Sequence, residues 1–210
     1  IKEDFCFLFV GHWLQGQIGE DRKNVGYMIK AFLETFKNKK IAPALILKTS
    51  QVTNSIMDRE EILNKIDAIR KTVKGDLPNI YLLHGDLEDK DINDLYNHGK
   101  VKAMVSLTKG EGFGRPLLEF SLSKKPIIAS NWSGHLDFLK DGAVLLNGEL
   151  KDVHESAQNQ FLIKGSKWFY VNYNEALKTL KDIYSNYNKY KTASFQLGKQ
   201  NKQNFSLEKM

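Results

Sequence analysis

Thr108-Lys-Gly-Glu-Gly-Phe-Gly-Arg-Pro-Leu-Leu-Glu119 is the stretch from which the fold of this chain can be read. The apolar run at residues 101–107 precedes it and is typical of a buried strand. Pro116 stands where a helical pattern begins, and proline is favoured at the first position of a helix. The stretch is therefore a glycine-rich loop between a strand and a helix. Such a loop lets the backbone approach a ligand, and the free N–H groups of the helix favour an anion.

Outward from this loop, apolar runs typical of strands alternate with segments of helical periodicity. The strands are expected at residues 4–11, 42–48, 79–83, 102–107, 126–130 and 143–146. The helices are expected at residues 22–36, 57–73, 89–96 and 116–123, with a short helix within 131–139. The alternation predicts βαβ units, and the continuous apolar strands predict a parallel sheet covered on both faces. The predicted fold class is α/β, a Rossmann-like, doubly wound parallel sheet of about six strands.

Several glycines follow the ends of predicted strands. Gly11 and Gly85 do so, as does the glycine-rich loop, so all three should meet at one edge of the sheet, where ligands bind in this fold class. Arg22 and Lys23 are expected at a helix N-terminus, where the helix dipole disfavours cations. Paired cations at that place indicate an anionic ligand, although solvated loop charges are the alternative.

The last third of the chain has a weaker pattern. Residues 147–165 are polar and predict an irregular insertion or functional loop. Residues 173–190 predict an exposed helix, and residues 205–210 the start of another. We therefore expect a Rossmann-like domain at residues 1–170 and a C-terminal helical segment at residues 171–210 that packs on it. The chain begins at Ile1, almost directly with a strand, and we expect a domain of a longer protein.

Composition narrows the function classes. The chain has 210 residues, of which 41% are hydrophobic, and a net charge of +6. The lysines are dispersed without an interleaved aromatic stripe, which argues against a nucleic-acid partner. No apolar run reaches the roughly 20 residues of a membrane span, and nothing indicates binding to a membrane surface. Cys6 is the single cysteine and lies in an apolar run, so we expect a buried thiol and a reducing, cytoplasmic compartment.

Metal chemistry is not expected. Asp89-Lys-Asp91 matches a D-x-D pattern that can bind a metal ion, but it more simply caps the helix that begins nearby. The five histidines show no ligand spacing, and there is no Walker-type phosphate loop. We therefore expect neither a metal nor another cofactor.

Spacing alone says little about Glu111 and Glu119, because two carboxylates eight positions apart often arise by chance. In the context of strand, glycines and helix, however, Glu111-Gly-Phe-Gly-Arg-Pro-Leu-Leu-Glu119 resembles the E-x7-E motif of retaining glycosyltransferases of the GT-B fold, family 4 type. Outer segments are similar to that family in order and spacing, from about residue 5 to residue 146. They are Phe9-Val-Gly11 with Arg22-Lys-Asn24, His84-Gly-Asp-Leu87, residues 126–130, Ser133-Gly134 and Asp141-Gly142.

The resemblance implies the C-terminal, donor-binding half of a hexosyltransferase-type enzyme, in which residues 1–170 would be the nucleotide-sugar-binding domain. Glu119 would accept hydrogen bonds from the ribose, and Glu111 would act as the catalytic carboxylate that holds hydroxyls of the donor sugar. Arg22 and Lys23 would neutralise the leaving diphosphate. The backbone of residues 112–118 would offer N–H groups to sugar and diphosphate. The donor-binding set implied by the resemblance is His12, Arg22, Lys23, Gly85, Leu87, Glu111, Gly112, Phe113, Gly114, Arg115, Pro116, Leu117, Leu118 and Glu119.

The resemblance also implies partners. The donor would be a nucleoside-diphosphate sugar, and the acceptor, a glycan, lipid or small molecule, would bind a second, N-terminal domain. The isolated chain would then bind donor but transfer little. His12 stands where the family often has Arg, and imidazole is mostly neutral at pH 7. Arg22 and Lys23 would therefore neutralise more of the phosphate charge. The sugar, the base and the acceptor stay undetermined.

Two other function classes remain open from the residues. One is a different nucleotide-sugar enzyme of the same fold, such as an epimerase or a hydrolase. The other is a non-catalytic nucleotide-sugar-binding module.

Overall fold

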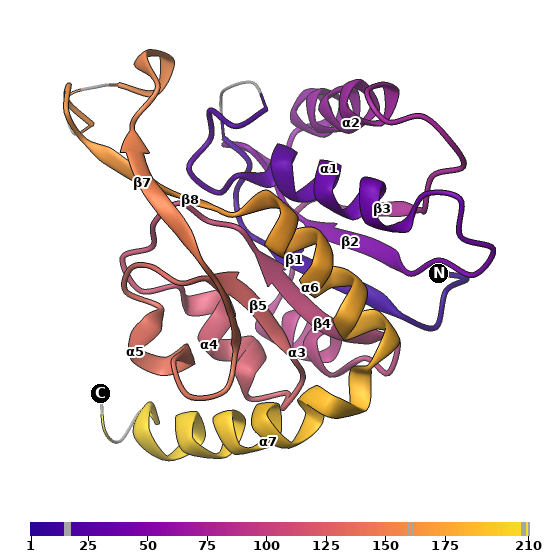
Figure 1. Ribbon diagram of the computed structural model, residues 1–210, viewed down its shortest axis with the longest axis vertical. Helices are drawn as coiled ribbons and strands as arrows, with labels where there is room; N and C mark the ends of the chain where they lie inside the picture. Colours follow the sequence, from indigo (N-terminus) through magenta and orange to yellow (C-terminus); the bar gives the residue numbers. More distant parts are fainter. Residues whose placement is uncertain (15–17, 159, 161, 207–208, 210) are drawn as a thin grey trace.

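The computed structural model describes residues 1–14, 18–158, 160, 162–206 and 209. Within these residues, a six-stranded parallel sheet has the order β3-β2-β1-β4-β5-β6 (Figure 1). The strands are β1 Cys6–Val10, β2 Ala44–Lys48, β3 Ile80–Leu83, β4 Val101–Ser106, β5 Ile127–Ser130 and β6 Val144–Leu146. This is the strand order of a doubly wound Rossmann-like sheet, so the predicted fold class is confirmed.

Helices cover both faces of the sheet and bury a separate apolar core on each. One core lies under α1 Val25–Phe36, α2 Ile56–Lys71 and α6 Tyr173–Ser185. The other lies under α3 Asp89–Asn97, α4 Arg115–Ser121, α5 Leu136–Leu139 and α7 Tyr187–Asn204. The two-sided burial explains why β1, β2, β4 and β5 read as continuous apolar runs. No helix in the described part of the chain is long and apolar enough to span a bilayer.

Cys6 is fully buried in β1, as expected from the apolar run around it. Burial raises the pKa of its thiol to about 11, and the nearby Glu3 carboxylate raises it further in the same direction. The thiol is therefore protonated near neutral pH and serves as a small core side chain.

The prediction that residues 147–165 form an irregular insertion is wrong for residues 148–152, while residues 159 and 161 lie outside the described residues. β7 Gly148–Asp152 pairs antiparallel with β8 Lys167–Val171 and makes a second, two-stranded sheet. This hairpin extends away from the main sheet (Figure 1). Every residue of β7 is exposed, so its sequence carries no apolar alternation that would indicate a strand.

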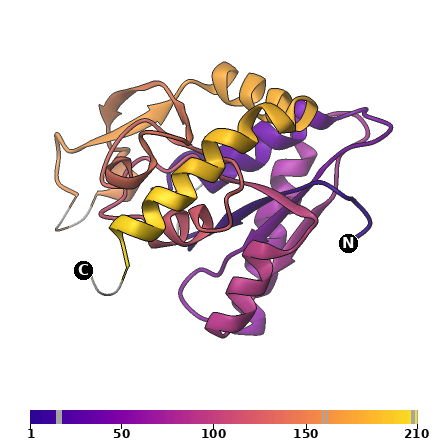
Figure 2. The same cartoon turned by 90° about the horizontal axis from the view of Figure 1, so that it is seen from below.

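The single helix expected at residues 173–190 is also wrong. α6 ends at Ser185, and α7 begins at Tyr187 and continues to Asn204. The chain changes direction between the orange α6 and the yellow α7 (Figure 2). Phe205 follows the end of α7 rather than starting a helix, while residues 207, 208 and 210 of that expected helix lie outside the described residues. Leu197 is the one large apolar residue on the buried face of α7, which otherwise consists of Ser194, Gly198 and Asn201. The face therefore has no apolar periodicity that would predict a helix.

The start of α1 differs from the expected one in a way that matters for the site. α1 begins at Val25, and Asn24 before it has a left-handed backbone with φ of 57°. Asp21 Oδ2 accepts a hydrogen bond of 3.1 Å from Val25 N. Arg22 and Lys23 therefore lie in the turn before α1 and not in its first turn.

Gly198 allows α7 to approach α4 closely. A Cβ at Gly198 would lie 2.5 Å from the carbonyl oxygen of Ser121, whereas a Cβ at Gly99 would meet no heavy atom within 4 Å. In an open helix, Gly→Ala stabilises by about 1 kcal/mol. We expect Gly198→Ala instead to lower the free energy of unfolding by about 1–3 kcal/mol, because the added methyl group forces the two helices apart.

Urea denaturation of both variants checks this expectation. The control, Gly99→Ala, should change the free energy of unfolding by less than about 0.5 kcal/mol. An unchanged or higher stability of Gly198→Ala would contradict the close α4–α7 contact.

Candidate functional site

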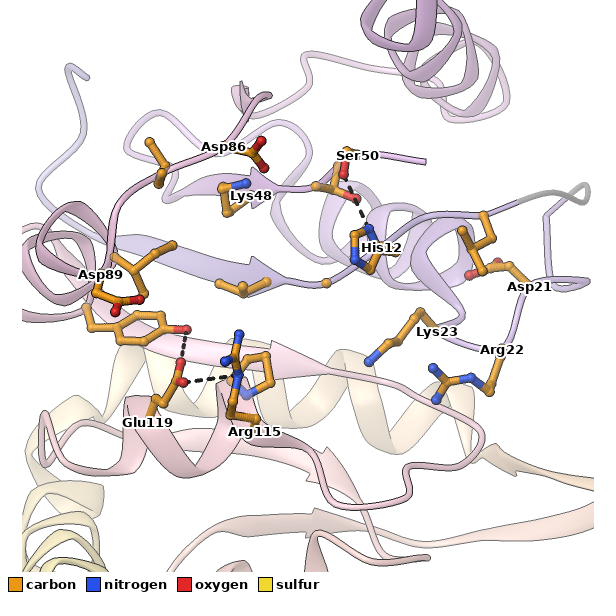
Figure 3. A pocket seen from close by; sticks show the side chains of 18 residues that line it. His12, Asp21, Arg22, Lys23, Lys48, Ser50, Asp86, Asp89, Arg115 and Glu119 are labelled. Carbon is orange, nitrogen blue, oxygen red and sulfur yellow. Dashed lines mark hydrogen bonds and ion pairs between the residues drawn. The ribbon is translucent and has the colours of Figure 1, made fainter. Parts of the chain in front are cut away.

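A cavity of about 470 Å³ lies at the carboxyl ends of β1, β2 and β3. Its other walls come from the turn before α1 and the first turns of α3 and α4 (Figure 3). This is the edge on which the sequence places the strand-end glycines. The lining residues are Val10, Gly11, His12, Leu14, Asp21, Arg22, Lys23, Lys48, Thr49, Ser50, Asp86, Leu87, Asp89, Ile92, Tyr96, Arg115, Pro116 and Glu119.

Two cations and one carboxylate join the loops that follow β1 and β4. Lys23 Nζ lies 2.5 Å from Glu111 Oε1, and Arg22 lies 3.3 Å from Glu111 Oε2. Arg22 also donates a hydrogen bond to the carbonyl of Gly110. Burial by itself would raise the pKa of the Glu111 carboxyl, but Lys23 and Arg22 hold it below its ordinary value. Glu111 is therefore ionised near neutral pH, and it forms ion pairs with both cations.

Ser133 and Gly134 fix the backbone of the glycine-rich loop from the other side. The hydroxyl of Ser133 donates to the Glu111 carbonyl at 2.6 Å and accepts from Glu111 N at 3.0 Å. A Cβ at Gly134 would lie 2.0 Å from the carbonyl oxygen of Gly112, so only glycine fits there. The Ser133 hydroxyl and the absence of a side chain at Gly134 together hold the loop in place.

Lys109 ties the glycine-rich loop to the turn before α1 and to β8. Its backbone N–H donates to the carbonyl of Arg22 at 2.9 Å, and its Nζ donates to the carbonyl of Gly19. The ammonium lies over the rings of Trp168 and Tyr170, 4.5 and 4.6 Å from their centroids. Burial lowers the pKa of Lys109 to about 8. Nothing in the sequence distinguishes this lysine from a solvated loop residue.

Glu119 projects into the other end of the cavity from α4. Its Oε2 accepts a hydrogen bond of 3.2 Å from the hydroxyl of Tyr96, and its Oε1 lies 3.3 Å from Arg115 Nε (Figure 3). Burial raises the pKa of Tyr96, and the charge of Glu119 raises it further, so the hydroxyl remains a donor. The sequence identifies Tyr96 only as an inward residue of its helix. Its role toward Glu119 becomes visible only when α3 and α4 are placed side by side.

The cavity brings together half of the sequence-predicted donor-binding residues. Lining it are His12, Arg22, Lys23, Leu87, Arg115, Pro116 and Glu119. Glu111 reaches it through its ion pairs with Arg22 and Lys23. His12 Nδ1 lies 3.3 Å from the hydroxyl of Ser50, which fixes the orientation of the imidazole ring.

The remaining predicted residues do not line the cavity: Gly85, Gly112, Phe113, Gly114, Leu117 and Leu118. The N–H groups of Leu117 and Leu118 both donate to the carbonyl of Gly114, at 2.9 and 3.3 Å. The Phe113 ring packs on Phe138. The Gly85 carbonyl accepts a hydrogen bond from Lys48 Nζ at 2.7 Å.

Sequence reasoning missed the polar residues after β2 and β3. Lys48 is the last residue of β2, and Thr49 and Ser50 follow it; Asp86 and Asp89 follow β3. Burial lowers the pKa of Lys48 although Asp86 is near. The rule that ligands bind at the carboxyl ends of parallel strands could have singled out Lys48.

Neither aspartate of the D-x-D pattern caps α3 as expected. The N-cap residue is Glu88, which makes no side-chain capping bond, and Asp89 and Asp91 lie in the first helical turn. There they complement the positive end of the helix dipole. Among the described residues, no group of three or more His, Cys, Asp or Glu side chains could hold a metal ion.

The sequence model of the family described as "Glycosyl transferases group 1" matches residues 16–165. This chain belongs to that family. A search of curated protein sequences finds no match to it. The family membership agrees with the transferase class that the glycine-rich loop predicts, whereas the retaining mechanism and the family 4 assignment remain predictions.

Several solved structures share the fold of this chain. The C-terminal domain of a group 1 glycosyltransferase from Francisella tularensis superposes with a TM-score of 0.63 at 16% identity, over 95% of this chain and 87% of that one. The catalytic domain of the cholesterol-α-glucosyltransferase of Helicobacter pylori gives 0.63 at 13% identity, over 97% and 99%. HepE of Anabaena, in complex with UDP-glucose, gives 0.59 at 16% identity, over 96% and 45%. The chain thus spans less than half the length of HepE.

The ion pairs of Glu111 give this group 1 domain a specific pH dependence. A carboxyl whose pKa is lowered on folding stabilises the fold fully above its unfolded pKa, near 4.5, and loses this contribution as the pH falls through the lower, folded value. We expect Glu111→Gln to cost about 1–3 kcal/mol of unfolding free energy at pH 7, because Lys23 loses its charged partner. The cost should shrink at pH 3.

Urea denaturation at the two pH values measures this difference. Glu61→Gln is the matched control, since Glu61 forms an exposed pair with Lys65 and should cost less than about 0.5 kcal/mol at either pH. An equal cost of Glu111→Gln at pH 3 and pH 7 would show that the charge of Glu111 does not stabilise the fold.

Proposed function

We propose that this domain binds a nucleoside-diphosphate sugar in the 470 Å³ cavity and takes part in transfer of the glycosyl group with retention of configuration. The observation that carries the proposal is the arrangement of charges along this one cavity. The Arg22–Lys23 pair lies at one end and the Glu119–Tyr96 pair at the other. A nucleoside diphosphate has the complementary arrangement: an anionic diphosphate that would face the cations and a neutral ribose whose hydroxyls would donate hydrogen bonds to Glu119.

Arg22 and Lys23 would neutralise the diphosphate. Breaking the bond between the anomeric carbon and the diphosphate oxygen leaves negative charge on the departing group, and preorganised cations stabilise it. Both cations are now paired with Glu111, so the incoming diphosphate would compete with that carboxylate. The released Glu111 would then be available to accept hydrogen bonds from hydroxyls of the donor sugar, next to the reacting carbon.

Glu119 would bind the ribose. A carboxylate accepts hydrogen bonds from two neighbouring hydroxyls, and the Tyr96 hydroxyl holds one of its oxygens in place. Leu87 and Ile92, from the segment after β3 and from α3, provide apolar surface in the same cavity for a base. Since Glu119 faces the ribose in this arrangement, the two-carboxylate chemistry of glycosidases is disfavoured.

In the proposed reaction the acceptor hydroxyl attacks the anomeric carbon from the face that the diphosphate leaves. The carbon–oxygen bond to the diphosphate breaks as the new glycosidic bond forms, and the acceptor proton passes to a diphosphate oxygen. The resembled family retains configuration in this way without a protein nucleophile. No metal is needed in this scheme, because Arg22 and Lys23 supply the positive charge.

In this proposal a second domain binds the acceptor, as in two-domain GT-B enzymes. We expect the 210-residue chain to bind donor but to transfer little, and robust transfer by the purified chain would contradict that. Product analysis with intact donor separates transfer from the epimerase and hydrolase alternatives. A cytoplasmic, reducing location is part of the proposal and rests on the single buried thiol.

Nucleotide sugars are expected to raise the melting temperature of the chain, because a ligand that binds only the folded state stabilises it by mass action. The screen uses UDP-, GDP- and ADP-sugars. Glu119→Ala should weaken binding of the preferred donor at least about tenfold, because the loss of even one hydrogen bond to a charged group costs about 1.5–3 kcal/mol. Asp94→Ala removes an exposed carboxylate of α3 outside the cavity and should leave binding unchanged. If no donor shifts the melting temperature, the proposed function is wrong.

Glu111→Gln separates the two proposed tasks of this carboxylate. The variant frees Arg22 and Lys23, so we expect it to bind the nucleoside diphosphate alone several-fold more tightly than the wild type does. Its affinity for the corresponding nucleotide sugar should fall relative to its affinity for the diphosphate, because the carboxylate that accepts hydrogen bonds from sugar hydroxyls is gone. Isothermal titration with both ligands measures the ratio. A variant that binds the diphosphate more weakly than the wild type would argue against competition for the cations.

A further inference from the structure

Lys48 lines the 470 Å³ cavity but takes no part in the proposed binding of diphosphate and ribose. It is the last residue of β2, and its partners in the sheet are Val10 of β1 and Leu83 of β3. Ile46 and Ala44, earlier in the same strand, belong to the core under α3 and α4. Because side chains alternate between the faces of a strand, the Lys48 side chain lies on that same face of the sheet. It therefore enters the cavity from the side on which α3 and α4 lie.

The ammonium of Lys48 differs from the other cations of the cavity. Arg22, Lys23 and Arg115 each form an ion pair with a glutamate. Within the described residues Lys48 forms no ion pair, and its Nζ donates one hydrogen bond, of 2.7 Å, to the carbonyl of Gly85. An ammonium has three N–H donors, so two remain for water or a ligand. Burial lowers the pKa of Lys48, and a ligand oxygen that accepts from it would favour the charged form.

The bond to Gly85 places Lys48 beside the base rather than beside the diphosphate. Two residues after Gly85, Leu87 is part of the apolar surface proposed for the base. Figure 3 shows Lys48 apart from Arg22 and Lys23, at which the diphosphate is proposed to bind. The part of a bound nucleotide within reach of the Lys48 ammonium is therefore the base.

The bases of nucleotides differ in what they offer to an ammonium. Uracil and guanine each carry a carbonyl oxygen on the edge away from the ribose, and this oxygen accepts hydrogen bonds. Adenine has no carbonyl, and its amino group is a donor that flanks both N1 and N7, the ring acceptors of that edge. A lysine ammonium can only donate. It therefore pairs directly with a carbonyl-bearing base, whereas on adenine it meets a second donor.

We propose that Lys48 selects the base of the donor nucleotide, with its ammonium donating to a carbonyl oxygen of uracil or guanine and discriminating against adenine. This inference rests on the function proposed above. It narrows the donor from nucleotide sugars in general to those with a carbonyl-bearing base. It also gives a task to a charged residue at the end of a strand whose other residues are all apolar.

Isothermal titration of the full chain with UDP, GDP and ADP tests this selection, with inorganic pyrophosphate as a probe that has no base. The wild type should bind UDP or GDP at least about tenfold more tightly than ADP, the effect of one hydrogen bond to a charged donor. Lys48→Met keeps an unbranched side chain but removes the donors. Its affinity for the preferred nucleotide should fall at least about tenfold, whereas its affinities for ADP and pyrophosphate should change by less than about threefold.

Lys48→Gln is a second variant should Lys48→Met fail to fold. A glutamine amide has both a donor and an acceptor, and it can pair with the amino group and a ring nitrogen of adenine. This variant should therefore shift the preference toward ADP. Lys71→Met, on the exposed side of α2 and outside the cavity, is the matched control and should leave all four affinities unchanged.

A wild type that binds ADP as tightly as UDP and GDP would overturn the inference. So would a Lys48→Met variant that keeps the base preference of the wild type. Equal weakening of pyrophosphate and nucleotides in that variant would assign Lys48 to the diphosphate and would likewise overturn it. Nucleotide binding without base selection contradicts this inference alone, whereas the absence of binding by any nucleotide contradicts the donor function as well.

Discussion

The ion pairs from Glu111 to Lys23 and Arg22 are the interaction on which the candidate site depends. They join the loop after β1 to the loop after β4, at the point where the order of the strands reverses. That reversal opens a crevice in every doubly wound sheet, because the connections from the two strands leave on opposite faces. In this chain three charged side chains bridge the crevice. The backbone N–H of Lys109 and the side-chain hydroxyl of Ser133 hold the bridging loop in place.

The central part of the fold could be predicted from sequence, because physical constraints there act on nearby residues. Strands buried on both faces must be apolar throughout, and the runs that contain β1, β2, β4 and β5 show it. The glycine-rich loop between β4 and α4 likewise carries its own signal, since Gly114 adopts φ of 89°, which disfavours other residues. Arg22 and Lys23 could be connected to this loop only because the parallel topology brings both strand ends to one edge.

The rest could not be predicted because its determinants lie far away in the chain. β7 exists through backbone pairing with β8, and its own residues are all exposed. α7 packs through Gly198 and the Asn201 amide, which bonds to the Ser121 hydroxyl and the Phe138 carbonyl, and neither residue produces an apolar period. Tyr96 reads as a core residue, and its hydrogen bond to Glu119 spans two helices on one face of the sheet.

The pairing of β1 with β4 has a consequence for how the chain folds. Cys6 is opposite Val101 in the middle of the sheet, so the two central strands meet only after a loop of nearly the whole first half of the chain has closed. Closing so long a loop costs conformational entropy before any contact repays it, and proteins rich in such contacts fold slowly. β1, β2 and β3 can pair through shorter crossovers, as can β4, β5 and β6. The Glu111 bridge crosses the seam between these halves, so we expect the crevice to assemble late in folding.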